Sequence, residues 1–492
     1  MLNGLEGLLL PFTIPYLGIL IAAGTFAGIY IGAIPGLSVT MAVSLLISFT
    51  FSWDTLSALA LMIGVFVGGV YGGARSAILL NIPGAPAAIA TALDGYPLAK
   101  KGLAGETIGI ATVQSVIGGL IGVLIMVTAT PLMSKIALGF APRDYFLIGI
   151  MGILLVGSMG SKSTAKGVFT GVLGVLIGLI GMDPFTGIGR FTFGNLNLLG
   201  GISYVAAMIG LFGVSEALYQ IRDIDRPMVK QEVTKIIPSW NVIYKFIPLT
   251  IRSSIIGGII GALPGTGGDI AAILAYDNAR RTVKNNKVEF GEGAIEGVIA
   301  PETANNAAIG GAFIPMLTLG IPGDSVTAII IGAMFIHGLR PGPLLILDNP
   351  SIFWFIVISL IVANVFLLIF GLMGIKLFTR IVEIPREKIL PSILVLSAIG
   401  AYSISGSYFE LLIVIIFGVI GYVFRVYNFP IGPIVLGMIL GPIIDSNFRR
   451  AILSSGSIVG FIVELFTNPI SFVLLAIIVY FLVYSYIQKR RI

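Results

Sequence analysis

The chain contains no cysteine, and its single histidine is His337. Thiol chemistry and metal sites built from cysteine or histidine are therefore excluded. Charged residues are also scarce, because Asp, Glu, Lys and Arg make up 11% of the 492 residues. A soluble domain carries about a quarter. These absences exclude an ordinary soluble protein and leave little material for an enzyme that needs a histidine base.

The chain is instead rich in apolar sequence, since 57% of its residues are hydrophobic and the mean hydropathy is +1.04. The 64 glycines and 25 prolines lie mostly within apolar runs, as is typical of membrane helices. The net charge of +6 is the surplus expected of cytoplasmic loops and does not indicate nucleic-acid binding. Residues 1–10 carry no basic run, so we expect no cleavable signal peptide. We expect an all-α polytopic membrane protein.

Lysine and arginine gather in few places, which the positive-inside rule assigns to the cytoplasm. They are Lys100 and Lys101, Lys162 and Lys166, residues 222–245, 280–287 and 376–388, Arg425, and residues 489–491. Crossings are then expected at about 55–100, 105–133, 143–160, 165–182, 197–219, 292–340, 351–375, 389–405, 408–424, 430–447 and 469–487. This path predicts a protein of the inner membrane with a cytoplasmic C-terminus and an N-terminus outside.

Residues 246–280 do not fit this path, because basic loops flank both of their ends. Their apolar arms of about 18 and 15 residues would span roughly 27 and 22 Å as helices, less than the ~30 Å hydrocarbon core. A re-entrant hairpin fits both facts, and two full crossings joined by a tight turn are the alternative. Residues 11–53 have the same form, and no Lys or Arg precedes Arg75. This first hairpin is therefore expected to enter from the outside.

A Pro-Gly pair recurs at matching places in the two halves of the chain. The pairs are Pro35-Gly36 and Pro83-Gly84 in the first half and Pro264-Gly265 and Pro322-Gly323 in the second. Such a pair breaks a helix, and lipid tolerates the freed backbone only where protein or a water-filled cavity surrounds it. Neighbouring residues match in the same order, which indicates duplication. We predict two inverted repeats, residues 1–243 and 244–492, each with a re-entrant hairpin (about 11–53 and 246–280) and a broken transmembrane helix (about 55–100 and 292–340).

Paired broken helices are typical of secondary transporters, whose substrate sites lie at such breaks. A passive anion channel is the alternative, but it gives no reason for two pairs of breaks. A membrane-embedded enzyme is a weaker alternative, because His337 has no nearby serine motif or acid pair. We therefore expect a transporter rather than an enzyme.

The motifs at these breaks resemble the large membrane subunit of the tripartite tricarboxylate transporters. The resemblance covers most of the chain, although Asp445 stands where Glu is expected in the similar stretch 441–447. It rests on residues 71–73, 81–84 and 91–100 of the first half and on residues 261–269, 290–293, 296–302, 304–307, 319–323, 338 and 341–343 of the second.

The resemblance implies import of di- or tricarboxylates such as citrate, driven by a sodium or proton gradient. It also implies two partners, a small four-helix membrane subunit and a periplasmic solute-binding protein. No cofactor is expected besides co-transported Na⁺ or H⁺, and a homodimer is left open. Separately, the Gly-rich hairpins and broken helices are expected to slide as one block against a frame of long apolar helices, as in an elevator.

A carboxylate substrate needs positive potential within the membrane, which the N-termini of half-helices supply. For Ser38, Thr40, Thr266 and Ser325, the alternative to substrate binding is that the hydroxyl bonds to a carbonyl of its own helix. For Arg75 the alternative is a structural pair, and for Asn305 and Asn306 beside Glu302 it is helix packing. The predicted substrate-binding residues are Pro35, Gly36, Ser38, Thr40, Arg75, Gly84, Ala85, Pro264, Gly265, Thr266, Gly267, Asn305, Asn306, Gly323 and Ser325.

A sodium ion would bind where unwound carbonyls and helix C-termini gather. Asn81 and Gly320 end the first half-helices and are candidate ligands. Asp269 and Asp324 are also candidates, because carboxylates beside an anionic substrate would repel it unless they hold a cation or a proton. Helix capping is the alternative for Asp324. Asp94 is expected to close its helix near the cytoplasm, and His337 to serve a surface or partner-facing role.

Overall fold

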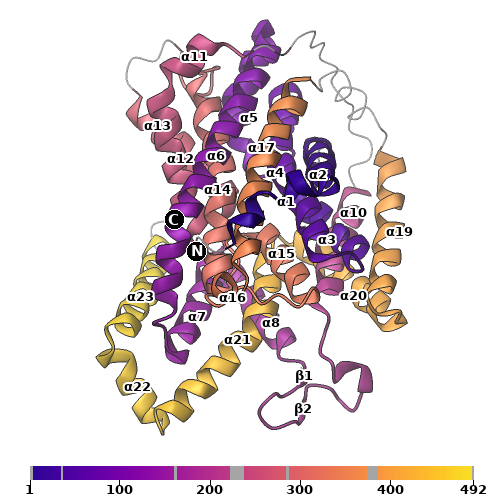
Figure 1. Cartoon of the computed structure of the whole chain (residues 1–492), viewed down its shortest axis with the longest axis vertical. Coiled ribbons are helices and arrows are strands. Elements are labelled where there is room, and N and C mark those ends of the chain that lie inside the picture. The colour runs from indigo at the N-terminus through magenta and orange to yellow at the C-terminus, as the bar shows by residue number, and fades with distance from the viewer. Residues whose placement is uncertain are drawn as a thin grey trace.

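The structure is a computed structural model that describes residues 4–34, 37–159, 163–221, 236, 238–283, 288–373 and 386–489. These residues are almost entirely helical (Figure 1). The exception is one antiparallel pair of two-residue strands, β1 (Gly181–Met182) and β2 (Gly189–Arg190). The prediction of an all-α chain is confirmed.

The first half contains a helix pair followed by an interrupted helix. The pair is α2 (Pro15–Ala33) and α3 (Val39–Thr50), and the interrupted helix is α4 (Thr55–Leu80) with α5 (Ala88–Leu98). The other elements are η1 (Leu5–Leu8), α1 (Leu10–Thr13), the π-helical turn η2 (Ala99–Leu103), α6 (Ala104–Ala137), α7 (Pro142–Met159), α8 (Thr164–Gly178), η3 (Leu196–Leu198), α9 (Tyr204–Met208), η4 (Ile209–Val214) and α10 (Ser215–Gln220).

The second half repeats this order. Its helix pair is α12 (Ile247–Ala262) and α13 (Gly267–Thr282), and its interrupted helix is α14 (Glu296–Leu319) with α15 (Ser325–Ile336). The other elements are α11 (Trp240–Lys245), α16 (Leu345–Asp348), α17 (Pro350–Met373), α19 (Arg386–Ser405), α20 (Tyr408–Val426), α21 (Gly432–Ser454), α22 (Ile458–Thr467) and α23 (Pro469–Lys489).

Within the described ranges, five helical segments are long and apolar enough to cross a membrane. A sixth span is formed if α21 and α22, which are bent by 96° at their junction, are counted together. The chain is therefore a multi-pass membrane protein. The five segments are Pro15–Ala33, Thr55–Leu80, Ala88–Ala137, Pro350–Met373 and Tyr408–Val426.

The helices before the two breaks end in the same way. α4 ends at Asn81 and α14 at Gly320, both in the left-handed conformation with φ of 55° and 70°. In each case the amide of this residue bonds to the carbonyl four residues earlier at 3.2 Å, which closes the last turn. Pro83 and Pro322 follow and cannot continue a helix. The local sequence therefore sets both breaks.

Glycines hold the first helix of each pair against the interrupted helix. A Cβ atom on Gly28 of α2 would lie 2.5 Å from the carbonyl oxygen of Val65 on α4. A Cβ atom on Gly257 of α12 would lie 2.2 Å from the carbonyl oxygen of Ala304 on α14. Only glycine allows such backbone contact. The same packing thus recurs at matching positions in both halves.

Several regions depart from the predicted path. Pro15–Ala33, expected as an arm of a re-entrant hairpin, is itself long and apolar enough to cross a membrane. The crossing expected at 430–447 continues as α21 to Ser454 and then turns into α22. Residues 181–203 carry β1 and β2 and project from one end of the molecule (Figure 1). Local hydropathy indicates neither the bend nor the segment 181–203. The bend lies at Gly456, with φ of 72°, and at Ser457, which caps α22, while contacts with distant residues hold the segment 181–203.

Ion pairs attach the segment 181–203 to α21. Asp445 pairs with Arg190 at 3.0 Å, and Arg449 pairs with Asp183 at 3.0 Å. The backbone N–H of Phe185 donates to Asp183 and, with the two arginines, holds the pKa of that carboxyl below its ordinary value. Asp445, the residue that departs from the expected motif, therefore anchors this segment.

Candidate functional site

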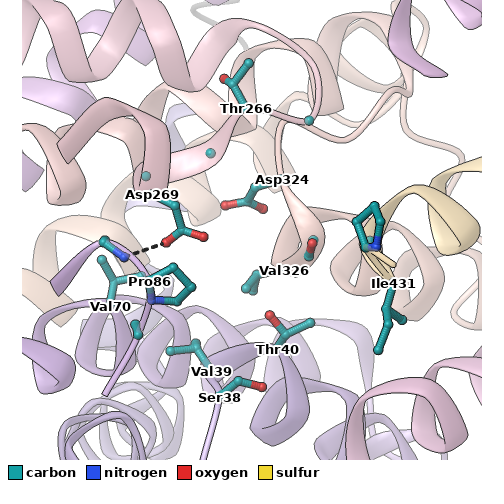
Figure 2. Close-up of a pocket in the computed structure, with 18 of the residues that line it drawn as sticks. Ser38, Val39, Thr40, Val70, Pro86, Thr266, Asp269, Asp324, Val326 and Ile431 are labelled. Carbon is teal, nitrogen blue, oxygen red and sulfur yellow. Dashed lines mark hydrogen bonds between the residues drawn. The ribbon is translucent and has the colours of Figure 1, made fainter. Parts of the chain in front are cut away.

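The chain breaks of the two halves meet around one cavity of about 590 Å³. The lining comes from the segments that follow each interruption, and Figure 2 shows these segments facing one another across the cavity. They are residues 38–40, 85–87, 265–269 and 324–326. Residues 429–433, which lead into α21, and side chains of α4, η4, α13, α14 and α20 line the rest of the wall. Pro35 and Gly36, which belong to the first tip, lie outside the described residues.

Five helices begin at this lining, namely α3, α5, α13, α15 and α21. The first amides of a helix have no intrahelical partner, and each N-terminus carries roughly half a positive charge. Backbone groups thus give the cavity a positive potential without lysine. Hydropathy does not indicate the contribution of α21, because residues 408–424 and 430–447 have the pattern of ordinary crossings.

The second hairpin tip is fastened to the second break. The amide of Gly265 donates to the carbonyl of Gly323 at 2.7 Å. The Thr266 hydroxyl donates to the carbonyls of Leu263, at 3.0 Å, and Ile260. The Thr266 side chain therefore closes the turn while the residue lines the cavity. A Cβ atom on Gly268 would lie 2.2 Å from the Oδ1 of Asn305, so a larger residue here would require the Asn305 side chain to move.

Two carboxylates lie in the same wall (Figure 2). Asp269 is exposed to the cavity, and its Oδ1 accepts from the backbone N–H of Ala87 at 3.1 Å. Asp324 caps α15, where its Oδ1 accepts from the amide of Thr327 at 2.7 Å. Asp324 therefore acts as a helix cap, which was the alternative to cation binding, and it also lines the cavity. Oxygen atoms of this kind are suited to a hard cation such as sodium.

The arginine in the cavity wall is Arg425, which the sequence reading placed only at a cytoplasmic boundary. Its Nη1 pairs with Glu216 at 2.6 Å, and its Nε donates to Ser215 at 3.2 Å. The signal available in the sequence was one arginine at the end of an apolar run, just before the helix-breaking Pro430. Arg425 is a cation that a carboxylate in the cavity could approach.

Arg75 does not line the cavity. Its side chain is fully buried, and its Nε donates to the hydroxyl of Tyr71 at 3.1 Å. Its Nη2 donates to the carbonyls of Phe370, at 3.2 Å, and Gly371 near the end of α17. Arg75 therefore has the structural role that was the alternative to substrate binding, because its guanidinium donates to carbonyls at a helix C-terminus.

The other predicted residues divide into two groups. The cavity gathers Ser38, Thr40, Ala85, Gly265, Thr266, Gly267, Asn305, Ser325, Asp269 and Asp324. The Ser38 Oγ also caps α3 by accepting from Met41 at 3.0 Å. The predicted residues that lie outside the cavity lining, besides Arg75, are Asn81, Gly84, Pro264, Asn306, Gly320 and Gly323. No cluster of three or more His, Asp or Glu side chains suited to a metal occurs in the part of the chain that the structure describes.

Asp94 joins the two halves of the chain. Its Oδ1 accepts from the amides of Gly291, Gly293 and Ala294 at 2.7–2.9 Å. Its Oδ2 accepts from the hydroxyl of Tyr276 at 2.9 Å. Asp94 therefore caps the loop before α14 rather than its own helix. His337 follows the last turn of α15 and lies outside the cavity lining.

A multi-pass helical membrane protein whose interrupted helices surround one cavity has the architecture of a membrane transporter. The comparison with protein families identifies the kind of transporter. Residues 19–436 match the model of the tripartite tricarboxylate transporter TctA family, and the chain belongs to this family. It is therefore a component of a tripartite tricarboxylate transporter.

Two relatives come from Agrobacterium vitis. One, named "Uncharacterized 52.8 kDa protein in TAR-I ttuC' 3'region", is 37% identical over 456 residues, or 92% of this chain and 90% of the relative. The other, "Uncharacterized protein in TAR-II ttuC' 3'region", is 40% identical over 222 residues, or 45% of this chain and 90% of the relative. No solved structure matches the chain.

Proposed function

We propose that this protein is a secondary active transporter that imports di- or tricarboxylates of the citrate type, coupled to a sodium or proton gradient. The observation that carries the proposal is the cavity lined by helix N-termini from both halves, with Arg425 in its wall. Backbone amides at helix N-termini bind anions without a counter-charge on a side chain. A substrate with two or three carboxylates fits this arrangement.

The charges of the cavity favour coupling to a cation. Five helix N-termini contribute about +2.5 in partial charge, since each carries roughly +0.5. Arg425 is already paired with Glu216, and Asp269 and Asp324 subtract from the total. Sodium or protons at these two aspartates would remove that repulsion. Substrate and cation would then promote each other's binding by the same coupling free energy. Asn81 and Gly320, as the caps of α4 and α14, remain proposed sodium ligands through their backbone carbonyls.

The arrangement of the two halves supports an elevator mechanism. We infer that residues 1–243 and 244–492 are inverted repeats, each with a re-entrant hairpin, α2–α3 and α12–α13, and a broken helix, α4–α5 and α14–α15. These eight helices would form the moving block, and helices such as α17 and α20 the frame. The glycine contacts within each half would keep the block rigid while it moves.

Membership of this family implies that the protein works together with other subunits. We expect a small four-helix membrane subunit beside this chain and a periplasmic solute-binding protein that delivers substrate. The location would be the inner membrane, with the C-terminus in the cytoplasm and the N-terminus outside. A homodimer is a further arrangement that purification would test.

Transport by the purified protein in liposomes tests the proposal. Radiolabelled citrate, succinate and malate would be offered with an imposed sodium or proton gradient, with and without the cognate binding protein. Accumulation above the external concentration is expected of a secondary transporter. Equilibration without accumulation would favour a passive channel, and conversion of the substrate would favour an enzyme.

A further inference from the structure

Glu302 is a carboxyl group that the cavity does not use. It lies on α14 between α5 and α6, and 1% of its surface is exposed. Its Oε1 accepts from the hydroxyl of Thr91 on α5 at 2.5 Å, and its Oε2 accepts from the hydroxyl of Ser115 on α6 at 3.1 Å. A buried acid on α14 is thus held by neutral hydroxyl groups from two other helices, α5 and α6.

Among the described residues, no positive charge is hydrogen-bonded or ion-paired to Glu302. In the described parts of the helices that pack against α14, no charged or titratable group is hydrogen-bonded or ion-paired to it. Asp94 binds the 291–294 loop and Tyr276, and Arg75 binds Tyr71 and the end of α17. The other charged side chains in these helices are Glu106 and Lys135 on α6, Arg252 on α12, Asp269, Asp277, Arg280 and Arg281 on α13, Asp348 on α16 and Glu296 on α14 itself. An ionised carboxylate buried in this way is costly, so a neutral carboxylic acid is favoured.

The two hydroxyls suit both protonation states of Glu302. A hydroxyl donates to a carboxylate, and the same hydroxyl can rotate to accept from a carboxylic acid. Asn306, one helical turn further along α14, is fully buried, and its Oδ1 has no hydrogen-bond partner within the described structure. Its Nδ2 donates to the main-chain carbonyl of Glu302 at 3.0 Å. The surroundings can therefore accept a proton on Glu302 without losing a hydrogen bond.

Glu302 lies beside the cavity wall but is not part of it. Thr91 follows Ala87, whose amide binds Asp269, by one turn of α5. Asn305, one turn after Glu302, lines the cavity and donates to the carbonyl of Val70 at 3.4 Å. α5 and α14 belong to different halves of the chain. A change at the cavity that shifts these helices would alter the hydrogen bonds to Glu302.

We propose that Glu302 takes up and releases a coupled proton during the transport cycle, at a site separate from Asp269 and Asp324. Uptake converts its carboxylate to a neutral acid, and release on the other side of the membrane restores the carboxylate. This inference rests on the proposed function, because it requires that the protein moves a carboxylate.

The test compares wild type, Glu302→Gln, Glu302→Asp and the control Glu296→Gln in liposomes with equal sodium on both sides. One assay measures counterflow of radiolabelled citrate, succinate or malate, which needs no net proton movement. The other measures accumulation driven by an imposed pH gradient, together with the pH change of a trapped dye. Glu302→Gln is expected to keep counterflow and lose gradient-driven accumulation and proton uptake. Glu296→Gln is expected to behave as wild type.

The other outcomes decide between the proposal, the proposed function and a purely structural role of Glu302. Accumulation by Glu302→Gln equal to wild type overturns the role of Glu302, as does sodium-driven transport by wild type without proton uptake. If wild type shows no counterflow of any substrate, the proposed function fails instead. If Glu302→Gln is unstable in detergent and inactive, Glu302→Asp decides. Proton-driven accumulation with a displaced pH profile supports the proposal, and an unchanged profile indicates a purely structural role.

Discussion

Arg425 is the arginine that lines the cavity in the described part of the chain, and its charge is shared with Glu216. We expect Arg425→Gln to raise the KM for a di- or tricarboxylate by about 10- to 100-fold, because a hydrogen bond to a charged group is worth about 1.5–3 kcal/mol. Arg425→Lys is expected to lose less, since it keeps the charge. Initial rates of uptake against substrate concentration measure the effect.

Arg143→Gln is the matched control for Arg425. Arg143 pairs with Glu464 at the same distance, 2.6 Å, but neither residue lines the cavity. Because Arg425→Gln leaves Glu216 without its partner, the double variant with Glu216→Gln separates loss of substrate contact from an uncompensated charge. Equal KM values for the Arg425 and Arg143 variants would remove Arg425 from the substrate site.

Asp269 offers a carboxylate to the cavity and is the better exposed of the two acids in its wall. Asp269→Asn is expected to flatten the dependence of uptake on sodium concentration, because the amide is a weaker ligand for a cation. Asp277→Asn is the control, since Asp277 lies on the same helix but pairs with Arg280 and Arg281. An unchanged sodium response in Asp269→Asn would leave proton coupling as the better mechanism.

Glycine contacts hold the first helix of each pair against the interrupted helix, and a larger side chain at such a contact tests their role. Gly257→Ala places a Cβ atom 2.2 Å from the carbonyl oxygen of Ala304 and must push α12 away from α14. Such overpacking costs about 1–3 kcal/mol, and a lower midpoint of thermal unfolding in detergent is expected. Gly200→Ala, where nothing lies within 4 Å of the added Cβ, should leave the midpoint unchanged. Equal midpoints for both variants would contradict the role of this contact.

At the scale of the whole molecule, the absence of cysteine makes crosslinking a direct test of the moving block. A Cβ atom on Gly152 of α7 would lie 3.8 Å from a methyl group of Ile321 at the second break. Gly152→Cys with Ile321→Cys should therefore crosslink the proposed block to α7, which lies outside it, in the conformation described here. Substrate and cation are expected to change its yield, because they shift the population of states.

Ile78→Cys with Gly95→Cys is the control pair for this experiment. Both positions lie in the proposed block, and a Cβ atom on Gly95 would lie 3.6 Å from that of Ile78, close to the separation in a disulfide. This pair should crosslink equally under all conditions. If the Gly152 and Ile321 pair does the same, the block does not move relative to α7.

The sequence by itself determined where this chain interrupts its helices and that the protein lies in a membrane. Hydropathy reports burial in lipid, and Pro83, Pro264 and Pro322 act on the backbone within a turn of where they stand. These are local effects, so the bounds of α4, α12 and α14 follow closely from the order of residues. Hydropathy does not indicate the bend before α22, which lies at the Gly456–Ser457 turn, or the segment 181–203, which ion pairs with α21 hold in place.

Only the tertiary structure decided which side chains meet. Arg75 and Arg425 both stand in apolar sequence, yet packing directs Arg75 to the end of α17 and Arg425 to the cavity. Glu302 meets Thr91 and Ser115 across three helices. Such contacts join residues far apart in the chain, and no local pattern specifies them because they depend on how the helices are arranged in space.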